Sequence, residues 1–191
     1  MSWSQTAYAD PAGYLTHRAR LVVELGPRLR PGDRVLDLAC GDGGLADFLP
    51  EQRYLGVDAS PEMVASARAA GRDVVEGDLN GYEPPEPVQA TTIFRAVYYA
   101  RDRRELLRRV GGFTETKLVF DLNPRQYRVD DVRADLEAAG FDRLVLHPFL
   151  FPQRHAPPAA VVRALERTGP LARALLRVRF SYLCAAFRTT A

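Results

Sequence analysis

The sequence predicts an α/β fold in which helices cover both faces of a mostly parallel β-sheet. Short runs rich in Val, Leu and Ile alternate with segments of helical periodicity, the pattern of consecutive βαβ units. A glycine-rich bend at 41–44 directly follows the first of these runs. Acidic residues also stand at or just after the ends of the first three predicted strands, where an open α/β sheet binds its ligands.

Each predicted strand is a short apolar run bounded by turn residues. The first begins after the turn signal Pro31-Gly32-Asp33, and a proline-rich loop at 84–87 separates the third from the fourth. The predicted strands are residues 34–38, 54–58, 74–79, 90–96, 117–122, 142–147 and 180–187.

The predicted helices have apolar residues at helical spacing. An N-terminal helical segment (about 1–30) has a partial apolar stripe within 14–29, and this stripe stops at Gly26-Pro27. Ser60 has the character of an N-cap with Pro61 at the first helical position, and Asp102 caps another helix. The remaining predicted ranges are 45–49, 61–70, 102–110, 130–139, 159–167 and 171–176.

Length and composition predict one globular domain over residues 1–191. The net charge of +2 does not favour a nucleic-acid partner. Cys40 and Cys184 stand in no metal-ligand spacing, so no metal is expected. The chain also lacks a secretory pattern and a long apolar run, which predicts a reduced, cytoplasmic protein.

The residues after the first two strands point to a nucleotide. Asp37 is followed by the bend at 41–44, where glycines let a backbone approach a ligand closely and turn into a helix N-terminus. Asp58 ends the second strand, where a carboxylate can accept hydrogen bonds from two ribose hydroxyls.

The next residues extend this site toward the adenine base of a nucleotide. Asp78 is placed to accept a hydrogen bond from an adenine amino group, with the Leu79 N–H facing a ring nitrogen and Met63 packing on the ring. Any one acid alone is as well explained as a cap or turn residue. Three acids at successive strand ends favour an adenosine site.

These segments resemble the motifs of a known family. Residues 35–44 (VLDLACGDGG) resemble the first motif of class I S-adenosylmethionine (SAM)-dependent methyltransferases, and residues 54–63 (YLGVDASPEM) are similar to the second. Residues 76–79 (EGDL) are similar to the third, and 94–102 stand where the family has its fourth-strand motif. The resemblance covers most of residues 14–147.

The resemblance implies a Rossmann-like, doubly wound sheet of seven strands, the last of them antiparallel, and SAM as cofactor with S-adenosylhomocysteine as product. It places Arg95 near the methionine part of SAM, and it makes Tyr14 and Arg18 candidates to face the SAM carboxylate. The other implied cofactor contacts are Asp37, Ala39, Gly41, Asp58, Ala59, Met63, Asp78 and Leu79.

The sequence departs from the family pattern at three places. Ala39 replaces the first glycine of the first motif, and Gln89-Ala90 replaces an acid before the fourth strand. Tyr98-Tyr99 stand where many relatives have two histidines, which leaves the catalytic residue unassigned.

The candidate catalytic residues are His147, as a general base after the sixth strand, and the pair Tyr98 and Tyr99. An ordinary packed histidine or aromatic residue is the competing interpretation for each. The candidate acceptor-binding residues are Asn123, Arg125, Tyr127 and His155.

A helical insertion at about 150–179 separates the last two strands and alternates apolar residues with arginines. It is interpreted as a lid over an acceptor, as an amphipathic helix making weak membrane-surface contact, or as an ordinary packed helix. The oligomeric state is left open.

The sequence thus predicts a small-molecule methyltransferase acting on oxygen or nitrogen of a lipophilic or acidic acceptor. The alternatives are a SAM-binding protein that does not methylate, such as a cyclase-like enzyme or a partner subunit, and a nicotinamide-binding protein. Residues 76–79 and the expected antiparallel ending argue against the last of these.

Overall fold

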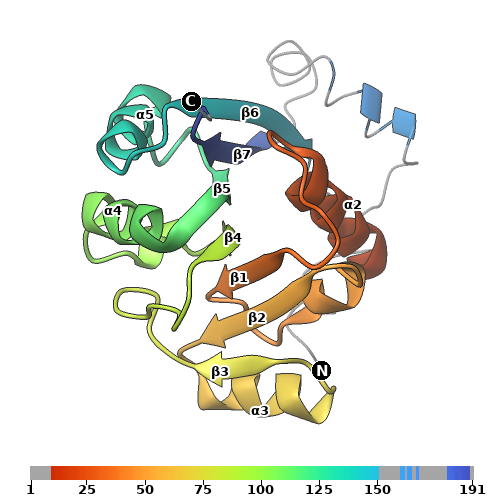
Figure 1. Ribbon diagram of the computed structural model, residues 1–191. Helices are drawn as coiled ribbons and strands as arrows, with labels where there is room; N and C mark the ends of the chain where they lie inside the picture. Colours follow the sequence, from red (N-terminus) through yellow and green to blue (C-terminus); the bar gives the residue numbers. More distant parts are fainter. Residues whose placement is uncertain (1–9, 151–159, 162, 165–166, 168–179, 190–191) are drawn as a thin grey trace.

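The computed structural model describes residues 10–150, 160–161, 163–164, 167 and 180–189. Within this part of the chain the centre is a seven-stranded sheet of order β3-β2-β1-β4-β5-β7-β6 (Figure 1). The strands are β1 (Arg34–Leu38), β2 (Arg53–Asp58), β3 (Val74–Glu76), β4 (Val88–Ile93), β5 (Thr114–Leu122), β6 (Arg143–Leu150) and β7 (Phe180–Phe187).

Strand direction confirms the predicted ending of the sheet. Strand β1 pairs in parallel with β2 and β4, and β3 and β5 continue the parallel pairing outward on either side. Strand β7 is antiparallel to both of its neighbours, β5 and β6. The chain reverses its direction of travel across the sheet between β1 and β4, and such a switch point is where α/β sheets bind ligands.

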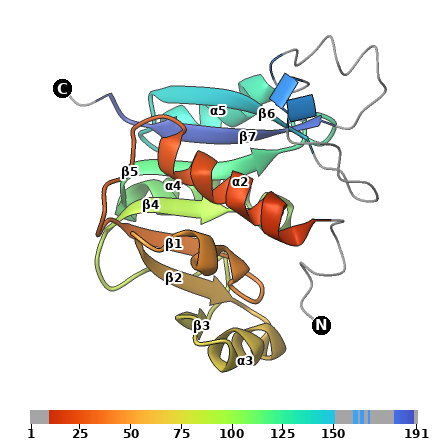
Figure 2. The same cartoon turned by 90° about the vertical axis from the view of Figure 1, so that its right-hand side faces the viewer.

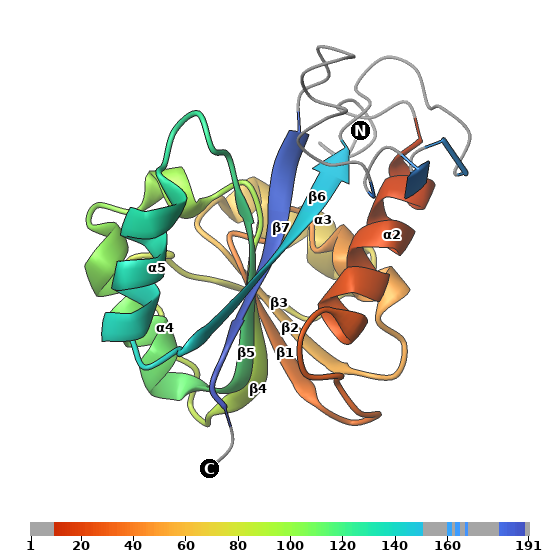
Figure 3. The same cartoon turned by 90° about the horizontal axis from the view of Figure 1, so that it is seen from above.

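Helices cover both faces of the sheet, as predicted. Helices α2 (Pro11–Glu24) and α3 (Pro61–Ala69) lie on one face, and α4 (Arg103–Phe113) and α5 (Val129–Ala138) lie on the other (Figure 3). Because side chains alternate along a strand, Leu36 packs in the cluster under α4 and α5, whereas its neighbour Val35 packs in the cluster under α2.

Helix α2 starts at Pro11, before the apolar stripe that begins at Tyr14, and ends at Glu24, just before the predicted stop at Gly26-Pro27. The Asp10 side chain accepts a hydrogen bond from the Gly13 N–H and caps the helix, with Pro11 at its first position. The helix ends at Glu24 because Leu25 is extended and Gly26 has a φ of 72°. Figure 2 shows α2 lying across the middle strands of the sheet.

The end of α2 is fastened to β5 by a buried amine. Lys117 is fully buried, and its Nζ donates hydrogen bonds to the carbonyl oxygens of Val23 and Leu25 at 3.0 and 2.9 Å. These contacts satisfy carbonyls at the helix end. Burial lowers the pKa of Lys117 to about 7.

Several predicted strand boundaries were wrong. Strand β3 ends at Glu76, before a turn in which Asp78 accepts hydrogen bonds. Strand β4 covers 88–93 instead of 90–96, because Arg95 has a left-handed φ of 53°. Strand β6 continues through Pro148 to Leu150, which is tolerated because β6 is an edge strand.

Most of the insertion at 150–179, including His155, lies outside the described residues, so its lid and membrane interpretations stay predictions. Residues 160–161, 163–164 and 167 are helical. Among the described residues, no helix combines the length and the apolar character that crossing a bilayer requires.

Candidate functional site

A pocket of about 500 Å³ lies at the carboxyl ends of β1, β2 and β4. The short helix η1 (Gly44–Phe48) and the turn η2 (Val97–Tyr99) follow β1 and β4 and form part of its wall. Pockets that bind small ligands have volumes of about 300–1,000 Å³. The lining residues are Tyr14, Leu15, Arg18, Asp37, Ala39, Cys40, Gly41, Asp42, Gly44, Leu45, Asp58, Met63, Phe94, Arg95, Ala96, Tyr98 and Tyr99.

The backbone after β1 bends sharply to form the floor of the pocket. Ala39, Gly41 and Gly43 all have left-handed φ angles, of 57°, 61° and 67°. A Cβ added to Gly41 would meet no atom within 4 Å, so this glycine borders open space and is required for its conformation alone. The bend therefore exposes backbone to a ligand, as the sequence predicted for residues 41–44.

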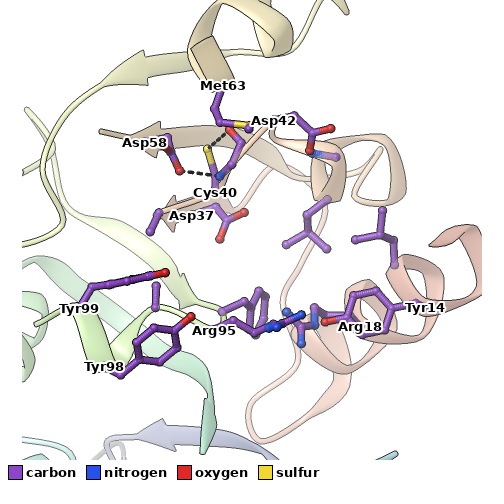
Figure 4. A pocket seen from close by; sticks show the side chains of 17 residues that line it. Tyr14, Arg18, Asp37, Cys40, Asp42, Asp58, Met63, Arg95, Tyr98 and Tyr99 are labelled. Carbon is purple, nitrogen blue, oxygen red and sulfur yellow. Dashed lines mark hydrogen bonds between the residues drawn. The ribbon is translucent and has the colours of Figure 1, made fainter. Parts of the chain in front are cut away.

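Asp58 ends β2 and faces this bend. One carboxylate oxygen accepts a hydrogen bond from the Gly41 N–H at 2.7 Å (Figure 4). The other accepts one from the Ser60 N–H at 2.9 Å. Each oxygen retains a further lone pair. The carboxylate is thus fixed in place by backbone donors while it can still accept hydrogen bonds from a ligand in the pocket.

Asp37 is a buried acid in the same wall. Its carboxylate accepts hydrogen bonds from the Tyr54 hydroxyl at 2.8 Å and from the Thr92 hydroxyl at 2.6 Å. Burial raises the pKa of Asp37 to about 6, although both hydroxyls and nearby Arg18 oppose the rise. The group is therefore ionised at neutral pH but titrates only slightly below it.

Two arginines lie across the pocket from these acids (Figure 4). The Arg18 guanidinium of α2 is buried over the Phe94 ring, 4.1 Å from its centroid, and lies 3.5 Å from the Asp121 carboxylate. The other Asp121 oxygen accepts a hydrogen bond of 2.5 Å from the Arg95 N–H, which holds Arg95 in its left-handed conformation. Burial raises the pKa of Asp121, and Arg18 opposes the rise.

Tyr98 and Tyr99 stand at the mouth of the pocket on η2. These two residues are 45% and 64% exposed, and their ring centroids are 4.3 Å apart. In Figure 4 both hydroxyl groups point toward the interior of the pocket. Burial and the neighbouring Tyr99 raise the pKa of Tyr98 to about 12, so its hydroxyl keeps its proton and acts as a donor.

The structure brings most of the predicted cofactor residues together. Asp78 and Leu79 are the notable exceptions, because neither lines the pocket. The Asp78 carboxylate contacts Asn80 and Arg101, and Leu79 is buried in the core under α4. Ala59 also lies outside the lining. The predicted residues that do line the pocket are Tyr14, Arg18, Asp37, Ala39, Gly41, Asp58, Met63, Arg95, Tyr98 and Tyr99.

His147 was placed after the sixth strand by the sequence, and this position was wrong. It lies within β6, opposite Leu183 of β7, and its ring centroid is 6.4 Å from that of His17 on α2. It does not line the pocket. The prediction was wrong because β6 does not end at His147 but continues through Pro148 to Leu150.

The predicted acceptor residues after β5 also lie outside the pocket lining. Tyr127 packs against the core on the α4 and α5 face, with the Arg103 guanidinium 5.1 Å from its ring centroid. Arg125 is exposed, and its N–H donates to the Asn123 side chain within the same loop. Their role in acceptor binding stays a prediction that the pocket geometry does not support.

Several residues at or next to the pocket escaped the sequence reasoning. Thr92 is the register partner of Asp37 on β4, and two consecutive threonines inside an apolar strand were the available signal. Asp121 lies near the carboxyl end of β5, as Asp58 does in β2. The sequence pattern predicts it only as part of a strand and not as a site residue. Cys40 lines the pocket as well, and burial raises the pKa of its thiol, which therefore stays protonated.

Comparisons with known proteins agree with this geometry. A family model described as a methyltransferase domain matches residues 35–115. The chain is 30% identical over 181 residues to a trans-aconitate 2-methyltransferase of Mycobacterium tuberculosis, an alignment that covers 90% of this chain and 59% of that protein. The chain thus spans between 41% and 59% of the lengths of the curated relatives from M. ulcerans and M. tuberculosis.

Solved structures share the fold at lower sequence identity. A SAM-dependent methyltransferase from Mesorhizobium loti has a TM-score of 0.60 at 20% identity, covering 89% of this chain and 96% of that one. Magnesium protoporphyrin IX methyltransferase from Synechocystis, solved with bound SAM, has a TM-score of 0.62 at 16% identity, covering 97% and 79%. Residues 35–115 thus belong to the methyltransferase-domain family, and the described part of the chain has the fold of SAM-dependent methyltransferases.

Proposed function

We propose that this chain binds SAM in the pocket and transfers its methyl group to a carboxylate oxygen of a small organic acid, which yields a methyl ester. The observation that carries the acceptor class is the composition of the wall opposite Asp37 and Asp58. Arg95, Tyr98 and Tyr99 line this wall, and their side chains supply hydrogen-bond donors.

The pocket fits SAM on the residues that the structure describes. Asp58 would accept hydrogen bonds from the ribose hydroxyls, beside the open space at Gly41. Asp37 would face the cationic part of the methionine moiety, and Arg18 would face its carboxylate. Met63 would pack against the adenine ring.

When bound, SAM supplies a methyl group on a positively charged sulfur. Transfer of this methyl group needs no general base if the acceptor oxygen is already an anion. Tyr98 and Tyr99 would orient a carboxylate by donating hydrogen bonds to it, and Arg95 would add a charge-assisted contact. Since Tyr98 keeps its proton, a carboxylate suits this wall better than an acceptor that must lose a proton.

The relatives support the same class of acceptor. They are named for methylation of trans-aconitate, which is an organic acid. Because the chain spans only 41% to 59% of their lengths, the identity of the acid is not transferred with the name.

Activity is tested by incubating the protein with SAM and separate acceptors, namely trans-aconitate, other di- and tricarboxylic acids, a primary amine and a phenol. We expect S-adenosylhomocysteine and a methyl ester, detected by mass spectrometry, only with acids. Tyr98→Phe should raise the KM for the acid about tenfold, the value of one lost hydrogen bond to a charged group, while the control Tyr127→Phe leaves it unchanged.

Methylation of the amine or the phenol would contradict the acceptor class. Binding of SAM without transfer to any acceptor would favour the alternative, a SAM-binding protein that does not methylate. Calorimetric titration with NAD provides the remaining control, and no binding is expected.

SAM affinity is expected to fall as the pH drops through about 6, because Asp37 has its pKa there in the ligand-free protein. A protonated Asp37 no longer attracts a cationic ligand, so affinity should decrease by up to about tenfold per pH unit below that value. Calorimetry at several pH values between about 5 and 7, where the ligand's own amino group stays protonated, measures this slope. Asp37→Asn should bind weakly with no such slope; an equal slope in the variant would assign the titration to another group.

A further inference from the structure

The segment that carries the two tyrosines is tied to a loop from the far side of the pocket. In the sheet, β3 and β4 are separated by β2 and β1, whose carboxyl ends form the pocket. Asn80 follows β3, and its side chain contacts the backbone on both sides of Ala100, after β4. The contact therefore joins two loops that flank the ends of β1 and β2.

The Asn80 carboxamide makes three hydrogen bonds besides that of its own N–H. Its Oδ1 accepts from the Arg101 N–H at 2.8 Å, and its Nδ2 donates to the Tyr99 carbonyl at 3.4 Å and to the Asp78 carboxylate at 2.9 Å. The orientation of the amide is fixed by its partners, because an N–H only donates and a carbonyl or carboxylate oxygen only accepts. The Asn80 side chain thus binds the backbone of residues 99 and 101 in the way that a neighbouring backbone segment would.

Asp78 holds this amide in place. The same carboxylate oxygen accepts hydrogen bonds from the Asn80 N–H and from Nδ2, and these two contacts lower the pKa of Asp78. The second oxygen lies 3.2 Å from the Arg101 guanidinium, an exposed pair that contributes little. On the other side, Val97 anchors η2 in the core. Tyr98 and Tyr99 are therefore held from both directions.

We propose that Asn80 is a positioning residue that holds the Tyr98–Tyr99 segment and couples it to ligand binding at the cofactor end of the pocket. The coupling rests on the proposed function, since it requires SAM or its product to bind between the two loops. The loop at 78–80 lies outside the pocket lining, so the coupling requires one end of the ligand to extend past this lining and contact the loop. A ligand that orders the loop in this way also orders residues 99–101 through the carboxamide. Cofactor binding then prepares the acceptor wall.

Hydrogen exchange of the Arg101 amide, measured by NMR, tests both the positioning role and the coupling. This N–H donates to the Asn80 side chain, and Arg101 does not line the pocket, so a bound ligand changes its exchange only through the loops. In the ligand-free protein, Asn80→Ala should speed exchange of this amide about tenfold, the effect of losing one hydrogen bond. The matched control is Gly81→Ala, whose added Cβ meets no atom within 4 Å and which should leave the rate unchanged. The core amides of Leu36 and Phe120 should not change in either variant.

With saturating S-adenosylhomocysteine, exchange at Arg101 should slow in the wild type and in Gly81→Ala but not in Asn80→Ala. Equal slowing in Asn80→Ala, or none in the wild type, would overturn the coupling. An unchanged ligand-free rate in Asn80→Ala would overturn the positioning role. Failure of the wild type to bind S-adenosylhomocysteine would instead count against the proposed function and remove the coupling with it, while the ligand-free comparison still decides the positioning role.

Discussion

Replacing Asp58 by alanine is expected to weaken SAM binding at least about a hundredfold. The carboxylate would make two hydrogen bonds to ribose hydroxyls, and a hydrogen bond to a charged group contributes about 1.5–3 kcal/mol. The N–H groups of Gly41 and Ser60 already fix the Asp58 carboxylate, so this side chain loses little conformational freedom when SAM binds. Isothermal titration with SAM and with S-adenosylhomocysteine measures the change.

The matched control for this substitution is Asp130→Ala, an exposed acid on α5 on the opposite face of the sheet. It should bind SAM as the wild type does. Thermal unfolding of Asp58→Ala separates lost binding from lost structure, because the bend after β1 also uses this carboxylate. A folded variant with an affinity within threefold of the wild type would show that the ribose assignment is wrong.

Alanine at Gly111 is expected to be the most destabilising of the small substitutions in α4. A Cβ there would lie 2.2 Å from the carbonyl oxygen of Ala139, at the end of α5, so the two helices would have to separate. Overpacking of this kind costs about 1–3 kcal/mol, and we expect the upper end because the clash is with backbone. The midpoint of thermal unfolding should fall by about 5–10 °C.

The neighbouring residue provides the control. Gly112 is also in α4, but a Cβ there meets no atom within 4 Å. Gly112→Ala should therefore stabilise the protein by about 0.5–1 kcal/mol, the difference in helix propensity. If both variants changed the free energy of unfolding, measured by urea denaturation, in the same direction, the close approach of α4 and α5 would be refuted.

The sequence predicted the sheet well because its signals are local. Strands 34–38 and 180–187 match the structure at both ends, and Ser60 and Pro61 start α3 as predicted. The errors arose where tertiary position decides the outcome. Pro148 would end a central strand, and only its place on the sheet edge, which the sequence does not reveal, lets β6 continue past His147.

In the candidate site, too, the residues with a local sequence signal were predicted, and those that depend on tertiary contacts were not. The bend at 41–44 and Asp58 could be predicted because each directly follows a strand in the sequence. Thr92 and Asp121 act through partners far away in the chain, Asp37 and Arg18, so that only strand register and helix packing reveal them. The link from Asn80 to residues 99–101 is of the same kind, because it joins loops from strands that are not neighbours in the sheet.

Lys117 is the single lysine among the 191 residues, and it is fully buried under α2. Reagents that acylate primary amines will therefore find no lysine to modify in the folded protein. Acylation at this position requires α2 to separate from β5, so the rate of labelling reports that separation. The lysine that fastens α2 thus also serves as a built-in chemical probe of unfolding, with no need for an engineered label.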